Sequence, residues 1–233
     1  MLAFESQFDQ RLLDLFLQFL TDNRRSKFEE VLKYRTRHIT VVMEDIYQSQ
    51  NASAVLRTCD LTGIQEVNII ENKYQYEVNP DVALGSSKWL YLKKFNKSKH
   101  NTIDAIDYLQ NSGYKIVATS PHLQNHSPES INLESPIALF FGTEKHGLSQ
   151  EVIERADTFI RIPMYGFTES YNISVSAALL LYTLTQRLHK SEISWQLTES
   201  DHKHLLLDWC RKSVQGADLI ERDFYRLNKR YPD

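Results

Sequence analysis

Residues 158–187 read TFIRIPMYGFTESYNISVSAALLLYTLTQR, and they decide how the rest of the chain is interpreted. The stretch begins with an apolar strand, expected over residues 159–162, which Pro163 ends because proline lacks the N–H needed in a strand ladder. An apolar helix is expected from about residue 173 to residue 187. The loop between them carries small or polar residues: Gly166, Thr168, Ser170 and Asn172. Polar loops held by rigid elements commonly bind ligands, so this loop predicts the floor of a binding site.

The composition is that of an ordinary globular protein, with 42% hydrophobic and 24% charged residues among 233. The longest apolar run, residues 177–181, is far shorter than the roughly 20 residues that cross a membrane. Residues 1–20 mix acidic and polar groups with hydrophobic ones, unlike a signal peptide. Cys59 and Cys210 give neither a disulfide framework nor metal-ligand spacing. We therefore expect a cytoplasmic protein without a membrane segment or a metal site.

The charge is unevenly distributed along the chain. The net charge is −3, yet residues 24–37 hold six basic residues and two acids, and residues 211–230 hold six basic residues and three acids. A third basic cluster lies at residues 93–100. Each cluster alone is typical of a solvated helix face. Three of them on an acidic chain favour a confined surface that binds phosphates.

Strand and helix patterns alternate from residue 38 onward. Strands are expected at residues 39–43, 67–70, 90–95, 115–118, 136–141 and 159–162, and helices at 102–109, 149–156 and 173–187. Such alternation indicates an α/β fold with a mostly parallel sheet, and the fully apolar run 136–141 suits its buried middle. The expected organisation is an N-terminal helical arm (1–37), a core (38–190) and a C-terminal helical appendage (191–233).

The two helical segments are expected to bury one apolar face each. Phe19 is assigned to the buried face of the first helix, and Asp22 or Asn23 to the N-cap of the second. Leu219 and Leu227 are assigned to the inward face of the appendage.

Two further segments supply candidate walls for the site. After the first strand, Asn51 is expected to cap a helix on which Arg57 points away from the apolar arc. Arg57 is either a surface residue paired with Asp60 or a guanidinium at the carboxyl edge of the sheet, where α/β folds bind ligands. Residues 142–149 nearly form a P-loop, but Leu148 replaces its lysine, and Glu144 would repel a triphosphate. Hydroxyl groups at Thr119 and Ser120 end another strand, which alone is more typical of a turn.

Taken together, the segments 51–60, 140–149 and 160–178 resemble motifs 1, 2 and 3 of the SPOUT superfamily, specifically the tRNA guanosine-2′-O-methyltransferase (TrmH) family. The resemblance covers nearly the whole chain and follows the family's motif order. It implies a deep C-terminal trefoil knot in which the motif 3 segment threads a loop. It also implies S-adenosylmethionine as cofactor, tRNA as partner, and a homodimer whose subunits both contribute to each active site.

The resemblance also implies roles for individual residues. The pocket for the cofactor would use Thr119, Gly142, Ile162, Met164 and Tyr171. The catalytic rim would comprise Asn51, Arg57, Glu144, Ser170 and Asn172. Contacts with RNA phosphates are assigned to the arginines of the arm: Arg24, Arg25, Arg35 and Arg37. A ribose 2′-hydroxyl is a poor nucleophile near pH 7, so proton removal or stabilisation of an alkoxide is needed, and a fixed Arg57 suits the second task.

Two positions depart from the family pattern. Ser49-Gln50 stands where the family often has Pro-His, and Tyr171 stands where leucine is common and would crowd or stack at the cofactor pocket. The function expected is methylation of the 2′-hydroxyl of a tRNA D-loop guanosine at position 18. The alternatives are a ribosomal RNA 2′-O-methyltransferase, a knotted RNA-binding protein without activity and, least favoured, a P-loop-like hydrolase.

Overall fold

The computed structural model describes residues 7–77, 79–120 and 126–228, which fall into two compact units. One unit is Thr36–Trp195, and the other combines Met1–Arg35 with Gln196–Asp233. The expected helical arm and helical appendage therefore belong to one unit, although they lie at opposite ends of the sequence.

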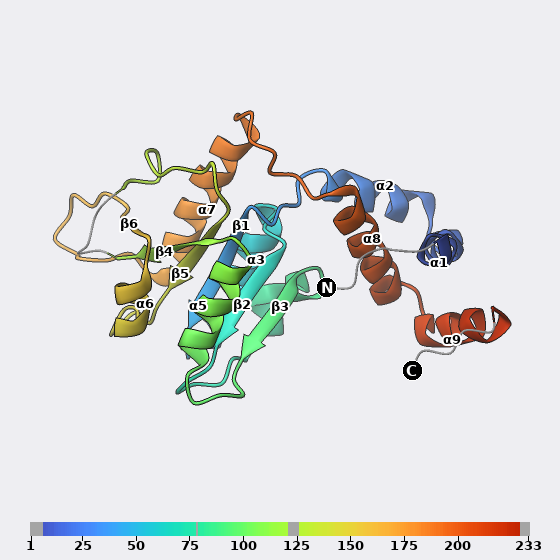
Figure 1. Ribbon diagram of the computed structural model, residues 1–233, viewed down its shortest axis with the longest axis horizontal. Coiled ribbons are helices and arrows are strands. Elements are labelled where there is room, and N and C mark those ends of the chain that lie inside the picture. The colour runs from blue at the N-terminus through green and yellow to red at the C-terminus, as the bar shows by residue number, and fades with distance from the viewer. Residues whose placement is uncertain (1–6, 78, 121–125, 229–233) are drawn as a thin grey trace. The chain divides into compact units, whose positions relative to one another are not determined.

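The larger unit contains a parallel sheet of six strands, as the alternating pattern predicted. The strands are β1 (Ile39–Glu44), β2 (Glu66–Ile70), β3 (Tyr91–Phe95), β4 (Lys115–Thr119), β5 (Ile137–Phe141) and β6 (Thr158–Ile160). Their order is β3-β2-β1-β5-β4-β6, and every neighbouring pair is parallel (Figure 1). All residues of β5 are buried, so its unbroken apolar run correctly predicted a central strand. Residues 90–95 were correctly predicted to form a strand, which is β3, and it lies at one edge of the sheet.

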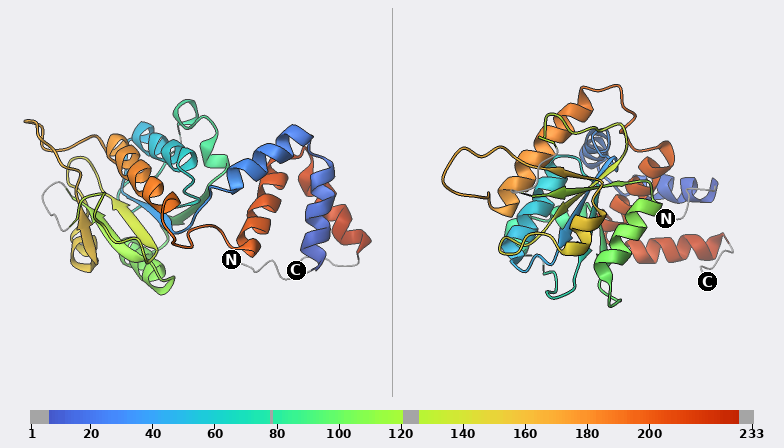
Figure 2. Two further views of the ribbon diagram at one scale, coloured as in Figure 1. Left: turned by 90° about the horizontal axis from the view of Figure 1, so that it is seen from above. Right: turned by 60° about the vertical axis from the view of Figure 1, so that its left-hand side comes forward.

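Helices cover both faces of this sheet (Figure 2). Helices α3 (Ser49–Leu61) and α7 (Ile173–His189) pack on one face, and α5 (Asn101–Asn111) and α6 (Gln150–Arg155) pack on the other. A short helix α4 (Pro80–Ala83) and a 3-10 turn (Ser86–Lys88) adjoin α3. Each face of the sheet has its own hydrophobic core. Successive side chains of β1 alternate between them, so Val41 and Met43 face α3 and α7 while Val42 faces α5.

Two local expectations about the core were wrong. Strand β6 ends at Ile160 rather than at residue 162, and residues 161–165 have no strand structure. Helix α3 begins at Ser49 with Gln48 as its N-cap, so Asn51 is not the cap. Asn51 lies inside the first turn instead, where its amide is free to contact other segments.

The smaller unit consists of α1 (Gln7–Gln18), α2 (Asp22–Leu32), α8 (Glu199–Ser213) and α9 (Ala217–Leu227). The N-cap of α2 is Thr21, whose side chain accepts a hydrogen bond from the N–H of Arg24, so neither Asp22 nor Asn23 caps it. Phe19 is 54% exposed because α1 ends at Gln18. Leu219 and Leu227, at the two ends of α9, are 51% and 77% exposed. The inward assignment of these three residues was wrong.

Membrane helices, metal sites and reactive cysteines were also sought among the described residues. No helix among them is long and apolar enough to cross a membrane, and they contain no group of three potential metal ligands. Cys59 and Cys210 are both buried and form no disulfide, and burial raises the pKa of the Cys210 thiol to about 11. At neutral pH this thiol stays protonated, so it is a packing residue rather than a nucleophile.

Candidate active site

A pocket of about 460 Å³ opens at the carboxyl edge of the sheet. It is lined by three segments: the end of β4, the loop after β5, and the chain from Ile160 to the first turns of α7. All five residues assigned to the cofactor lie in this lining: Thr119, Gly142, Ile162, Met164 and Tyr171. Glu144 and Ser170 line it too. The volume falls within the range of roughly 300–1,000 Å³ for small-molecule sites.

The loop after β5 closes on itself in a tight turn. The N–H of Thr143 donates to the carbonyl of Gly147 at 3.0 Å, and the N–H of Gly147 donates back to Thr143 at 2.9 Å. A Cβ at position 142 would overlap the backbone of Gly147 and Leu148, so only glycine fits there. The N–H of His146 donates to Thr143 Oγ1 at 3.0 Å. A P-loop needs such amides to cradle phosphates, and here they are already engaged, so the hydrolase alternative loses its geometric basis.

Three residues from three distant segments meet beside this pocket. Asn51 Nδ2 donates to Glu144 Oε1 at 3.0 Å, and Asn172 Nδ2 donates to the same oxygen at 2.7 Å. The third side of the triangle is closed by Asn172 Nδ2, which lies 3.2 Å from Asn51 Oδ1. We call Asn51, Glu144 and Asn172 the polar triangle. Its carboxylate is held by two amides, and Glu144 Oε2 remains for other partners.

Asn172 has a second task, because it is the N-cap of α7. Its Oδ1 accepts a hydrogen bond from the N–H of Ser174 at 2.8 Å. That contact assigns the orientation of the amide, since the oxygen must face the helix and the Nδ2 group must face Glu144. The capping hydrogen bond therefore directs Asn172 Nδ2 toward Glu144.

A buried carboxylate that the sequence interpretation missed supports the same loop. Glu44, at the end of β1, is 3% exposed. Its Oε1 accepts from Thr102 Oγ1 and from Ser149 Oγ, both at 2.7 Å, and its Oε2 accepts from the N–H of Ser149 at 2.8 Å. Ser149 also caps α6 by accepting from the N–H of Val152. An acid that ends a mostly apolar strand, five residues before the start of α3, was the available signal.

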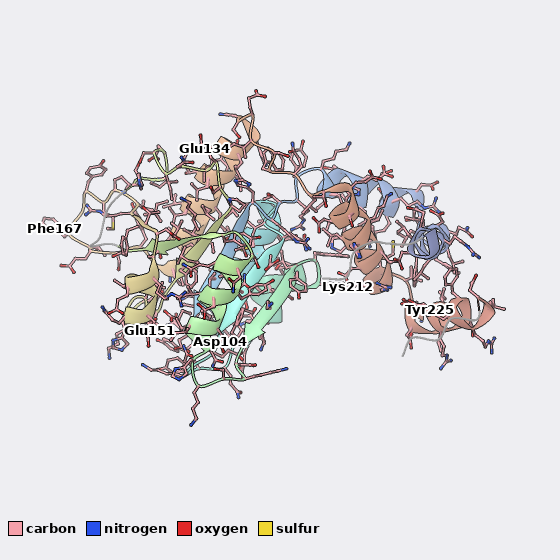
Figure 3. The ribbon with its side chains drawn as sticks, viewed as in Figure 1. Asp104, Glu134, Glu151, Phe167, Lys212 and Tyr225 are labelled. Carbon is pink, nitrogen blue, oxygen red and sulfur yellow. The ribbon has the colours of Figure 1, made fainter. Side chains whose placement is uncertain are left out.

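The remaining pocket residues differ in how firmly they are held. The hydroxyl of Thr119 donates to the carbonyl of Phe140 at 2.7 Å, which fixes its side chain at the end of β4. Ser170 and Tyr171 are exposed, and Tyr171 keeps 43% of its surface accessible. Farther out on the same loop, Phe167 is fully exposed and points away from the sheet (Figure 3). The loop from Met164 to Asn172 thus presents groups to the pocket at both ends and to solvent at its tip.

Arg57 is placed differently from the polar triangle. It lies on the exposed side of α3, as its spacing predicted, and it is not among the residues that line the pocket. Within one copy of the chain, the Arg57 side chain is thus exposed and lies outside the pocket lining.

The four arginines assigned to RNA are not equivalent. Arg24 is exposed, and Arg25 lies 3.9 Å from Asp22. Arg35 is only 1% exposed, with its guanidinium 5.3 Å from the centre of the Trp209 ring, so a direct phosphate contact from it is contradicted. Arg37 lies 3.9 Å from Glu66 Oε2 in the larger unit. Burial raises the pKa of Glu66, while the nearby Arg37 charge acts the other way.

The residues of this site lie within a span that matches a known protein family. The profile of the SpoU rRNA Methylase family matches residues 38–182 of the chain. This chain belongs to the SpoU rRNA methylase family. The matched span includes the pocket lining, the polar triangle and Arg57, and it confirms the resemblance on which the three motifs were identified.

Relatives of this SpoU-family chain extend the similarity beyond that span. A Borreliella burgdorferi protein named tRNA (guanosine(18)-2′-O)-methyltransferase is 46% identical, over 88% of this chain and 92% of its own. A Thermus thermophilus protein of the same name is 32% identical, over 82% of this chain and 98% of its own. The crystal structure of the A. aeolicus TrmH/SpoU tRNA modifying enzyme has a TM-score of 0.72 at 30% identity and covers 83% of this chain and 98% of that one.

Proposed function

We propose that this protein transfers a methyl group from S-adenosylmethionine to the 2′-hydroxyl of guanosine 18 in tRNA. The observation that carries the proposal is the polar triangle beside a 460 Å³ pocket, in a chain 46% identical to a protein named for this reaction. The family's own name refers to ribosomal RNA, so that substrate is the principal alternative for the test below.

The pocket suits S-adenosylmethionine in both shape and chemistry. Apolar side chains of Ile160, Ile162 and Leu148 can enclose a flat base, and the carboxylates of Glu144 and Glu169 suit a ligand with positive charge. Thr119, Gly142, Ile162, Met164 and Tyr171 are the residues proposed to hold it. When bound, the cofactor supplies an electrophilic methyl group on a sulfonium.

The protein's own groups would then orient the ribose and stabilise charge. The 2′-oxygen would gain negative charge as its proton passes to solvent water, and a guanidinium fixed nearby would lower the energy of that charge before the oxygen bonds to the methyl group. Arg57 is the proposed source, since its side chain is exposed and ready to meet the RNA. Guanidinium groups seldom give up a proton, which favours stabilisation of the alkoxide over direct proton removal by Arg57. Asn51, Asn172 and Ser170 would position the ribose, and Glu144 would hold the two amides.

The knotted core is part of the proposal. Residues 142–149 and the chain from Ile160 to α7 line one pocket, and α7 returns across the sheet to pack against α3. A close approach of this kind is what a threaded segment requires. An experimentally determined trace of the backbone tests it, and a loop that passes beside residues 142–149 without threading would reject the knot.

A homodimer is the third part of the proposal. Val175, Leu179 and Tyr182 are 44%, 42% and 64% exposed, and their spacing of four and three residues places them on one face of α7. An apolar helix face of this kind is suited to packing against a second copy of the chain. Because Arg57 does not line the pocket of its own chain, the second copy would supply its Arg57 to that pocket. Sedimentation of the purified protein is expected to give twice the mass of one chain. A fully active monomer would reject the shared site.

The function is tested by incubating the protein with radiolabelled S-adenosylmethionine and either total tRNA or total ribosomal RNA. Label is expected in tRNA, and mapping of 2′-O-methyl groups is expected to find it at guanosine 18. Label confined to ribosomal RNA would establish the alternative substrate. Bound cofactor with no transfer to either RNA would support the reading as an RNA-binding protein without activity and reject the proposed reaction.

A further inference from the structure

The third basic cluster of the sequence has no part in the pocket or the polar triangle. Residues 93–103 include four lysines and one histidine and no acid, on a chain with a net charge of −3. The segment runs from β3 into α5, so it lies at the carboxyl edge of the sheet, as the pocket does.

The four lysines divide into a pair that contacts other side chains and a pair in the following loop. Lys93 Nζ lies 3.1 Å from the centre of the Tyr108 ring, and Lys94 Nζ lies 3.0 Å from Glu71 Oε1. These two charges therefore already have partners within the protein. Lys97 and Lys99, in contrast, are both exposed in the loop between β3 and α5. This division shows which charges remain for a partner.

Side-chain hydrogen bonds hold the loop that carries Lys97 and Lys99. The N–H of Ser98 donates to Asn101 Oδ1 at 3.0 Å, and the N–H of His100 donates to Ser98 Oγ at 2.9 Å. Asn101, only 5% exposed, donates from Nδ2 to the carbonyl of Glu71 at 3.0 Å. A loop fixed in this way loses little entropy when it binds, which suits it to a preformed contact.

Hydrogen bonds through Glu44 connect a residue beside this loop with a residue beside the pocket. Thr102, next to Asn101, donates to Glu44, and Glu44 also accepts both hydrogen bonds from Ser149. Ser149 directly follows Leu148, which lines the pocket. The lysine loop is therefore a neighbour of the pocket loop rather than a distant surface feature.

We propose that Lys97 and Lys99 bind phosphate groups of the RNA substrate beside the active site. The surface, here named the lysine loop (residues 96–100), would contact the sugar–phosphate backbone and not the bases, because lysine is a point charge without a base-reading geometry. This inference rests on the proposed function for the identity of the RNA.

The acidic residues at the same edge of the sheet mostly have partners within the protein. Glu44 is buried and accepts three hydrogen bonds, and Glu71 is bound by Lys94 and Asn96. Asp104, in the first turn of α5, is an exposed acid nearby (Figure 3).

The test measures the affinity for an unmodified tRNA transcript at several salt concentrations. The variant is the double substitution Lys97→Ala with Lys99→Ala. The matched control is Lys115→Ala with Lys190→Ala, which removes the same charge from exposed positions at the start of β4 and the end of α7. Each lost phosphate contact lowers the magnitude of the slope of log affinity against log salt by about 0.7–0.9. The variant lacks two such contacts, so its slope should be smaller in magnitude by about 1.4–1.8. The control should keep the slope of the unaltered protein. In methyl transfer the variant should raise KM for tRNA and leave kcat unchanged.

The outcomes separate this inference from the proposed function. A slope and KM in the variant equal to those of the unaltered protein would overturn the lysine loop while methyl transfer by the unaltered protein still stands. Equal losses in variant and control would also overturn it, because they would reflect total charge alone. A lower slope in the variant, in a protein that methylates no tRNA, would support the lysine loop and reject the proposed reaction.

Discussion

Arg57→Ala is expected to lower kcat for methyl transfer by about 100- to 1,000-fold, the loss typical when one group that stabilises an oxyanion is removed. The affinity for S-adenosylmethionine should stay unchanged, because Arg57 does not line the pocket. Stability should also change little, since the side chain is exposed on α3. Single-turnover transfer to tRNA measures the first quantity, and calorimetric titration of the cofactor measures the second.

Arg57→Lys is the matched variant for this prediction. It keeps the positive charge and removes the planar fork, so it should recover part of the activity if Arg57 stabilises charge. A large loss of cofactor affinity in Arg57→Ala, parallel to the loss of kcat, would show instead that Arg57 supports the structure of the pocket.

Glu44→Ala is expected to destabilise the protein by roughly 2–5 kcal/mol, because the two hydroxyl groups and the N–H that donate to it would lose a buried acceptor. Thermal unfolding followed by circular dichroism measures the effect. For a unit of this size, each kcal/mol lowers Tm by about 2–4 °C. The pocket loop should also lose its anchor at Ser149, so the affinity for S-adenosylmethionine should fall.

Two further variants make the Glu44 result specific. Glu44→Gln keeps the shape but turns an N–H₂ group toward donors, so it should be intermediate in Tm. Glu129→Ala removes an exposed carboxylate and should stay within about 0.5 kcal/mol of the unaltered protein. A Glu44→Ala protein as stable as the Glu129→Ala protein would contradict the role assigned to the buried hydrogen bonds.

Strong local patterns predicted most of the core. The apolar run of β5 could only be a buried strand, and the alternation of strands and helices required parallel pairing. Predictions failed where a residue lies at the end of an element. Phe19 and Leu227 have apolar spacing, but each lies where its helix ends, and more than half of its surface is exposed among the residues that the structure describes. Helical periodicity assumes that the helix continues, and it says nothing about where the helix stops.

The site shows a different limit of sequence reasoning. Asn51, Glu144 and Asn172 were each found from their own motif, but their mutual hydrogen bonds span 93, 28 and 121 residues of sequence. Asn51 was assigned a capping role because asparagine is a favourable N-cap residue near the start of a helix. In the structure its amide instead donates to Glu144, in a different segment of the chain. Arg35 was assigned to RNA from the charge of its cluster, and its burial against Trp209 depends on a helix far along the chain. Glu44 was overlooked because its partners are equally remote in sequence.

The double use of Asn172 has a consequence for which residues this position tolerates. For the end of α7 alone, serine, aspartate and asparagine are nearly interchangeable, since each offers an oxygen to the first N–H groups of the helix. Glu144 and Asn51 add a demand for two further hydrogen bonds, both donated by Asn172 Nδ2 while Oδ1 accepts from the helix. A serine hydroxyl has one hydrogen and could serve only one of these two acceptors, and an ionised aspartate could serve neither. The helix alone would therefore accept several residues at this position, and the two neighbouring side chains favour asparagine.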